Sequence, residues 1–136
     1  MTEKPNEDWK AENNSITMVN QPSFQKTSEE MLELAIQIAT NSHLGQKRWD
    51  NTSYIIHPQS VANSVEGINY KIVAWLHDVL EDTGETEESL IKQGISKELV
   101  EEIKILSRNK YQSYYKFIIE ILPHEIARKV KIADLK

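Results

Sequence analysis

Residues 72–76 read IVAWL and lead directly into HDVLEDT at 77–83, so that a histidine and three carboxylates follow a strongly apolar run. The pattern predicts one buried helix from about residue 70 to residue 82, which ends near Thr83 and Gly84. Burying ionised side chains is costly unless something pairs with them. This stretch therefore predicts a helical core and, within it, a group of side chains that needs a partner.

Helical spacing of apolar residues recurs on both sides of that stretch. Thr27 and Glu30 have the spacing of a capping box, Pro58 suits the first turn of a helix, and Ser96 is a typical N-cap. No alternating strand pattern or internal repeat competes with this interpretation. We expect an all-α fold, a compact bundle of six or seven helices. The expected helices span about 27–42, 58–66, 70–82, 87–93, 96–106, 111–122 and 123–135.

The size and composition of the chain indicate one ordinary domain. It has 136 residues and normal globular content, with 39% hydrophobic and 27% charged residues. Residues 1–24 are polar and aperiodic, so we expect a flexible N-terminal arm followed by a domain over 25–136. The chain has no cysteine and no apolar stretch near the roughly 18 residues that span a bilayer. We therefore expect a cytoplasmic protein that does not enter a membrane.

The net charge of −5 argues against broad binding of DNA or RNA, which depends on a basic surface. It leaves a small phosphorylated ligand open, because a metal ion and a few local cations can bind a nucleotide on an acidic protein. The candidate cations are Lys47, Arg48, Arg108, Lys110, Arg128, Lys129 and Lys131, and most of them are expected to be solvated surface charges. Arg108 could approach the pocket after the helix over 96–106, although a solvated position is expected for it.

Helical geometry brings the polar groups of HDVLEDT together. Residues four apart share a face, so His77 would stack with Glu81 and Asp78 with Asp82, all in one wedge of the helix. Three carboxylates there repel one another unless a cation is present. A divalent metal resolves that conflict, and mixed nitrogen and oxygen ligands suit Mn²⁺, Fe²⁺, Zn²⁺, Co²⁺ or Ni²⁺ better than Ca²⁺. The alternative is an exposed acidic helix end with the histidine partly buried.

Two further residues support the metal interpretation. His57 directly precedes Pro58, at an element boundary where a ligand can be directed into a cleft. Asp134 lies on an apolar helix face, between Ala133 and Leu135, where a carboxylate is otherwise out of place. Another histidine, His43, is expected to order the loop around it or to support the site from outside the ligand set.

Four segments in order resemble a known family. HLGQKR at 43–48, YIIHP at 54–58, HDVLEDT at 77–83 and KIADL at 131–135 are similar to segments of the HD-domain phosphohydrolases. Within that family they look like the hydrolase domain of the RelA/SpoT alarmone enzymes and their small stand-alone relatives. The resemblance covers roughly residues 28–136.

The resemblance implies an HD-domain helical bundle that removes the 3′-pyrophosphate from guanosine tetra- or pentaphosphate, giving GDP or GTP and pyrophosphate. It implies Mn²⁺, or another divalent transition metal, as the cofactor and a guanine nucleotide as the ligand. Glu81 and Asp82 match the acidic pair that positions water and transfers protons, and Arg48 matches a position that faces the nucleotide. We assign Lys47 and Trp49 to the same substrate-binding segment. The residues that match the four metal ligands are His57, His77, Asp78 and Asp134.

The chain departs from the family pattern in three places. Trp49 replaces a common lysine, and residues 51–53 read NTS where the family often has a glycine and a proline. The chain also stops two residues after Asp134, where the family continues. We therefore expect a domain truncated at its C-terminus, with apolar surface that a homodimer would cover.

These departures leave two other functions open. One is hydrolysis of another nucleotide, of the 5′-nucleotidase or deoxynucleoside triphosphate phosphohydrolase type. The other is a non-catalytic regulatory module of the HD type. The presence of Glu81 speaks against the regulatory module, which has no chemical need for that acid.

Overall fold

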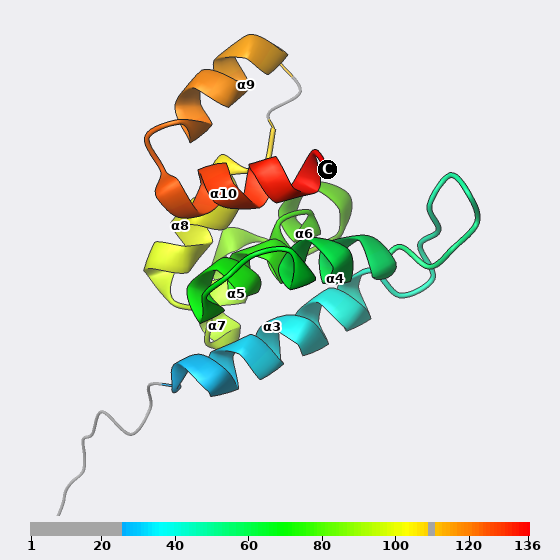
Figure 1. The fold of residues 1–136 in the computed structure, drawn as a ribbon. Coiled ribbons are helices and arrows are strands. Elements are labelled where there is room, and N and C mark those ends of the chain that lie inside the picture. The colour runs from blue at the N-terminus through cyan, green and yellow to red at the C-terminus, as the bar shows by residue number, and fades with distance from the viewer. Residues whose placement is uncertain (1–25, 109–110) are drawn as a thin grey trace, which may run out of the picture.

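The computed structural model describes residues 26–108 and 111–136, and within these ranges all regular secondary structure is helical (Figure 1). The predicted arm over 1–24 lies outside the described residues. None of the described helices combines the length and the apolar character needed to cross a bilayer. The helices are α3 (Ser28–Ser42), α4 (Ile56–Asn63), α5 (Ile68–Leu76), α6 (Val79–Asp82), α7 (Glu87–Gln93), α8 (Lys97–Ile105), α9 (Tyr114–Ile121) and α10 (Glu125–Asp134).

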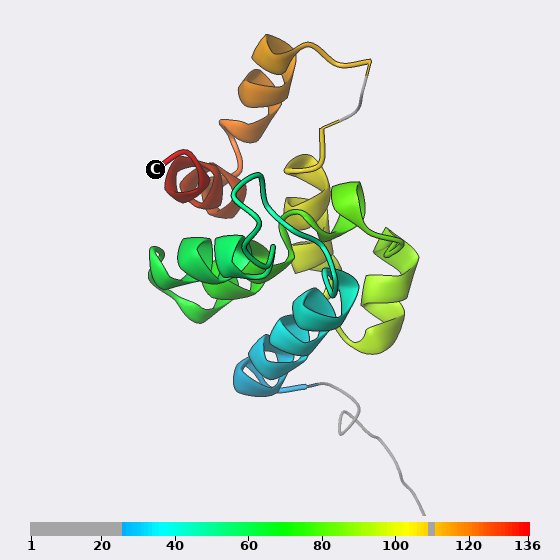
Figure 2. The ribbon, with the colours of Figure 1, turned by 90° about the vertical axis from the view of Figure 1, so that its right-hand side faces the viewer.

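Helix α5 is the centre of the bundle. Helices α3, α4, α8 and α10 all pack against it, and its residues 72–76 are all buried. A helix that is apolar all round has no face for water, so it is stable only when neighbours surround it. Figures 1 and 2 show α3 on one side of α5 and α10 on the opposite side, with α9 beyond α10. The predicted all-α bundle is confirmed.

Several predicted helix ends are confirmed by the hydrogen bonds made there. The Thr27 hydroxyl accepts from the Glu30 N–H at 3.1 Å, and the Thr27 N–H donates to the Glu30 carboxylate at 2.9 Å. The Ser96 side chain accepts from the first turn of α8. Helix α7 ends at Gly94, whose φ of 122° is costly for any residue with a Cβ. Local capping chemistry therefore fixes these helix ends without help from tertiary contacts.

The predicted single helix over 70–82 is wrong, because two residues interrupt it. His77 and Asp78 separate α5 from α6, which raises the number of described helices to eight. The His77 N–H approaches the Ala74 carbonyl oxygen, a three-residue turn tighter than an α-helix, and His77 Nδ1 reaches the same oxygen at 2.6 Å. Neighbouring side chains of a continuous helix point about 100° apart. The interruption lets His77 and Asp78 face the same place.

The segment between α3 and α4 also differs from the prediction. Residues 43–55, expected to be an irregular loop, fold back as a narrow hairpin in which Lys47 and Ser53 form an antiparallel bridge. Asn51 has φ of 72°, a conformation that asparagine tolerates better than most residues, so the turn forms without glycine. Helix α4 then begins at Ile56, two residues before the predicted start, which places His57 in its first turn.

The core can be tested with two isoleucines of different burial. Ile103 is fully buried, whereas Ile91 is 43% exposed. We expect Ile103→Ala to lower the free energy of unfolding by about 2–5 kcal/mol. The substitution removes buried apolar atoms, and the surrounding core does not fully collapse into the cavity that they leave. The control Ile91→Ala should cost about 0.5 kcal/mol. Urea unfolding followed by circular dichroism measures both, and equal losses would contradict the packing described.

Candidate functional site

Four side chains from three separate parts of the chain meet beside the centre of the bundle. His57 comes from the first turn of α4, His77 and Asp78 from the interruption between α5 and α6, and Asp134 from the last residue of α10. The His57 Nε2 atom lies 2.7 Å from Asp134 Oδ1 and 3.8 Å from Asp78 Oδ2. The His77 Nε2 atom lies 3.1 Å from Asp78 Oδ2 and 3.4 Å from Asp134 Oδ1. All four predicted ligands are therefore neighbours.

The orientation of His77 is set from behind. Its Nδ1 atom lies 2.6 Å from the Ala74 carbonyl oxygen, so Nδ1 carries the proton and donates it. The side chain is buried, and its Nε2 atom has no hydrogen-bond partner among the residues that the structure describes. A buried nitrogen with its lone pair directed at carboxylates is the arrangement that a metal ligand needs.

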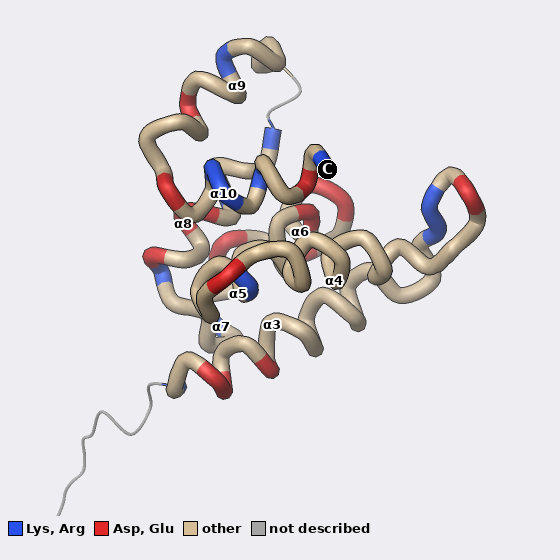
Figure 3. Tube along the Cα trace, viewed as in Figure 1, with Lys and Arg blue, Asp and Glu red and all other residues tan. Residues whose placement is uncertain are grey.

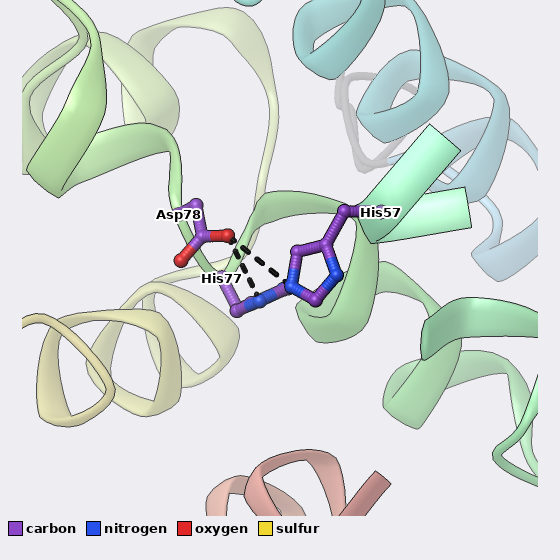
Figure 4. A group of neighbouring side chains, drawn as sticks. All are labelled: His57, His77 and Asp78. Carbon is purple, nitrogen blue, oxygen red and sulfur yellow. Dashed lines mark ion pairs between the residues drawn. The ribbon is translucent and has the colours of Figure 1, made fainter. Parts of the chain in front are cut away.

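The donor set suits a divalent ion. One ligand atom from each of His57, His77 and Asp78 lies within 4.8 Å of the other two, and Figure 4 shows the two imidazoles and the carboxylate facing one another. Two nitrogens and carboxylate oxygens without sulfur are typical of Mn²⁺, Fe²⁺ or Zn²⁺ sites. These residues therefore fit the metal implied by the sequence.

The electrostatics of this cluster show what a cation would replace. Burial opposes the charged form of His77, but the nearby carboxylates of Asp134 and Asp78 outweigh it and raise the pKa of His77 to about 10. Burial also opposes the charged form of Asp134, yet His57 and His77 hold the pKa of that carboxyl well below its usual range. The carboxylates thus favour positive charge at Nε2 of His77, and a proton and a metal ion would compete for that position.

A pocket of about 190 Å³ opens next to the cluster. Two cations line it, Arg108 and Lys131, together with the carboxylate of Glu81. The Lys131 Nζ atom lies 3.2 Å from Asp134 Oδ2 and 5.5 Å from the centre of the Phe117 ring. The Arg108 Nε donates to the Gln112 carbonyl oxygen at 3.2 Å. Both cations are therefore held in place beside the four clustered side chains. The residues lining the pocket are His77, Asp78, Glu81, Leu106, Arg108, Tyr114, Phe117, Lys131 and Asp134.

A larger groove of about 650 Å³ lies beside this pocket and shares Arg108 with it. Four carboxylates, those of Glu85, Glu87, Glu101 and Glu120, line the groove and outnumber its two cations, Lys104 and Arg108. Such a wall repels a polyanion. The smaller pocket is therefore the better place for a phosphate group, although it offers less room.

The two predicted acids, Glu81 and Asp82, contact different neighbours, although the Asp82 N–H donates to the Asp78 carbonyl oxygen at 3.0 Å as in a continuous helix. Glu81 lines the pocket, where burial, followed by the charges of Asp82 and Asp78, raises its pKa. The Asp82 carboxylate lies on the hairpin side, 3.3 Å from the Tyr54 hydroxyl. Glu81 shares the pocket with His77 and Asp78, and Asp82 shares the Tyr54 hydroxyl with Asp78, so the four polar groups still lie together.

The structure does not bring the predicted substrate residues Lys47, Arg48 and Trp49 into the pocket. They belong to the hairpin 43–55, which extends away from the helices in Figure 1 and carries a basic segment followed by an acidic one in Figure 3. None of the three lines the pocket, and Trp49 is 91% exposed.

Sequence reasoning missed two side chains that face the site. Lys131 precedes Asp134 by three residues, one helical turn, and Tyr54 precedes His57 by three; this spacing was the available signal. Arg108, for which a solvated position was expected and an approach to the pocket was the alternative, lines the pocket. His43, expected to order its loop, is buried and lies 3.0 Å through Nδ1 from the Gln46 side-chain oxygen.

A scan against protein-family models gives no match. Among curated proteins, the chain is 32% identical over 113 residues to the guanosine-3′,5′-bis(diphosphate) 3′-pyrophosphohydrolase of Haemophilus influenzae, and 33% identical over 117 residues to the protein of that name from Aquifex aeolicus. It is also 32% identical over 82 residues to the probable GTP pyrophosphokinase of Mycobacterium leprae. These alignments cover 71%, 77% and 57% of this chain but only 16%, 17% and 10% of the three relatives.

A solved structure, described as a metazoan orthologue of SpoT that hydrolyzes ppGpp, shares the fold of this chain. The TM-score is 0.62 at 22% sequence identity, and the match covers 76% of this chain and 65% of that chain. Sequence and fold thus confirm the resemblance carried by the four motifs. The chain is a homologue of the RelA/SpoT-type (p)ppGpp 3′-pyrophosphohydrolases, and its described helices form an HD-type bundle.

Proposed function

We propose that this chain is a metal-dependent phosphohydrolase that removes the 3′-pyrophosphate from guanosine 3′,5′-bispyrophosphate. One observation carries the proposal: His57, His77, Asp78 and Asp134 meet in one cluster, and a pocket with two held cations opens beside it. The curated relatives named as 3′-pyrophosphohydrolases support it. The chain spans less than a fifth of the length of those relatives, so their activity is proposed for this protein and does not follow from the similarity alone.

The four clustered side chains would hold Mn²⁺, or a similar divalent transition metal, through two imidazole nitrogens and carboxylate oxygens. The unpartnered, buried Nε2 of His77 favours this assignment, because it is costly to leave such an atom without a ligand. When bound, the ion supplies hydroxide near neutral pH and offsets the charge that develops on the phosphoryl group.

Glu81 is proposed to take the proton of the attacking water. Its pKa is raised by burial, then by Asp82 and Asp78, so the carboxylate is a better base than an exposed glutamate. It lines the pocket beside Asp78 and Asp134, within the space where the phosphate would lie. We propose that Asp82, on the far side of Asp78, assists by fixing the orientation of the water.

Arg108 and Lys131 are proposed to bind the 3′-pyrophosphate. Both line the pocket, and the Lys131 side chain is only 19% exposed, so its charge is poorly screened by solvent. A planar guanidinium can donate to two phosphate oxygens at once, and an ammonium adds a third contact. These two local cations would allow an acidic protein to bind a polyanion.

The pocket accommodates only part of a nucleotide. Its volume of about 190 Å³ is below the roughly 300–1,000 Å³ of ordinary ligand pockets. We propose that the pyrophosphate enters it while the guanosine extends outside, toward the hairpin with Lys47, Arg48 and Trp49. A guanine nucleotide, rather than DNA or RNA, is the proposed ligand. The cytoplasmic location and the homodimer stay predictions from the sequence.

The metal site is tested by removing one ligand. We expect the protein to bind one Mn²⁺ per chain in calorimetry and His77→Ala to bind it about 100-fold more weakly or not at all, since losing even an outer partner costs about 10–100-fold. His124→Ala is the matched control, because His124 contacts Glu102 on the surface and lies outside the cluster. Equal affinities in the three proteins would exclude this site.

Hydrolysis is tested with guanosine 3′,5′-bispyrophosphate, Mn²⁺ and a panel of other nucleotides. We expect pyrophosphate release that falls by about 10²- to 10⁴-fold in Glu81→Gln, which keeps the shape of the side chain but not its basicity. Glu33→Gln, at an exposed position of α3, serves as the control. Turnover of other nucleotides alone would reassign the substrate.

The phosphate subsite has its own test. We expect Arg108→Ala to raise KM by about 10- to 100-fold with a smaller effect on kcat, because a charge-assisted hydrogen bond to phosphate is lost. Arg128→Ala is the matched control, since Arg128 donates to the Leu122 carbonyl oxygen and does not line the pocket. An unchanged KM in Arg108→Ala would remove this residue from the subsite.

A further inference from the structure

The hydroxyl of Tyr54 lies close to two carboxylates with different proposed roles: Asp78, a metal ligand, and Asp82, which orients the water. It lies 2.6 Å from Asp78 Oδ2 and 3.3 Å from Asp82 Oδ2. Carboxylates only accept, so the phenol is the donor, and the shorter distance assigns its proton to Asp78. The same Oδ2 atom of Asp78 lies 3.1 Å from His77 Nε2 and 3.8 Å from His57 Nε2. Tyr54 therefore bonds the very oxygen that faces the metal-binding imidazoles.

The Tyr54 ring is fixed by its neighbours on both sides. It lies against the His43 ring with a centroid distance of 4.8 Å and meets the His57 ring edge-on at 5.9 Å. Its N–H closes the base of the hairpin on the Gln46 carbonyl oxygen at 2.9 Å, and its own carbonyl oxygen accepts from the His57 N–H at 2.9 Å. The ring is thus positioned jointly by the hairpin and by the start of α4.

A second connection runs from the hairpin to Asp82. The Gln46 side-chain nitrogen donates to the Asp82 carbonyl oxygen at 2.9 Å, so its side-chain oxygen is the atom that accepts from His43 Nδ1 at 3.0 Å. His43 is 2% exposed, which places this pair of bonds partly out of water. The end of α6 and the base of the hairpin are therefore held together beside Tyr54.

We propose that Tyr54 is a positioning residue: its hydroxyl orients the Asp78 oxygen that binds the metal and keeps the Asp82 carboxylate next to it. A carboxylate oxygen has two lone pairs, so Asp78 Oδ2 can accept a hydrogen bond from Tyr54 and coordinate a metal ion at the same time. Partners outside the ligand set orient ligands in this way and typically contribute about 10–100-fold to metal affinity. The role of Asp82 in this inference rests on the proposed function, whereas the role of Asp78 needs only the metal site.

The test removes one oxygen atom. Tyr54→Phe keeps the ring between its two histidine neighbours, and Tyr70→Phe is the matched control, because the Tyr70 hydroxyl bonds Glu125 on the surface away from the cluster. We expect Tyr54→Phe to bind Mn²⁺ about 10–100-fold more weakly in calorimetry, with Tyr70→Phe unchanged. At saturating Mn²⁺ we expect a lower kcat in Tyr54→Phe with an unchanged KM, because Asp82 is no longer held.

Unfolding by heat in a chelator establishes that the variants are folded. Gln46→Leu is the second variant: it leaves the hydroxyl of Tyr54 in place and removes the amide that holds Asp82, so kcat should fall while Mn²⁺ affinity is kept. Mn²⁺ affinity and kcat equal to those of the unaltered protein in Tyr54→Phe would overturn the inference, as would a raised KM alone. If the unaltered protein hydrolyses no alarmone but Tyr54→Phe binds Mn²⁺ more weakly, the proposed substrate fails and the positioning of Asp78 stands.

Discussion

The contact between His77 Nδ1 and the Ala74 carbonyl oxygen is the interaction on which the site depends. It occurs where the central helix is interrupted. The Ala74 oxygen there accepts from both the backbone N–H and the ring Nδ1–H of His77. With Nδ1 committed to the backbone, Nε2 is directed at the carboxylates of two other elements. The core that surrounds α5 makes this orientation rigid, because a buried imidazole has few alternative rotamers in a close-packed interior.

Acidic and basic side chains lie close together around the pocket. The chain is acidic overall, and a carboxylate-lined groove runs next to the pocket, yet the pocket itself has two cations in its wall. At physiological salt, exposed charges are screened within about 8 Å, so the nearest groups dominate what a ligand experiences. The net charge therefore argues against binding of an extended polyanion, but it does not determine whether a single pyrophosphate can bind.

Much of the fold could be predicted from local chemistry. The Thr27 capping box, the Ser96 cap and the helix that ends at Gly94 depend on residues adjacent in sequence, and all three are confirmed. The interruption at His77 could not be predicted from periodicity, because its cause is a side chain that bonds the preceding turn. A helix-wheel argument pairs His77 with Glu81 and Asp78 with Asp82, but it does not predict that Glu81 lines the pocket while Asp82 approaches Tyr54.

The candidate site was predictable in its ligands and less so in its surroundings. The sequence indicated His57, His77, Asp78 and Asp134 through ordered motifs, and the structure brings them together. For Arg108 a solvated position was expected and the pocket was the alternative, because whether a side chain after α8 reaches the pocket is a tertiary property that no local pattern encodes. Lys47, Arg48 and Trp49 lie on the hairpin and outside the pocket, and their part in substrate binding stays a prediction.

The wide separation of the ligands along the chain has a consequence for folding. His57 and Asp134 are 77 residues apart and belong to helices on different sides of His77, so an ion held between them would act as a cross-link. An ion that binds only the folded state adds a stabilisation that grows with the logarithm of its concentration. It would also fasten the last turn of α10, where helices ordinarily fray. Metal supply would then affect the stability of the fold as well as its chemistry.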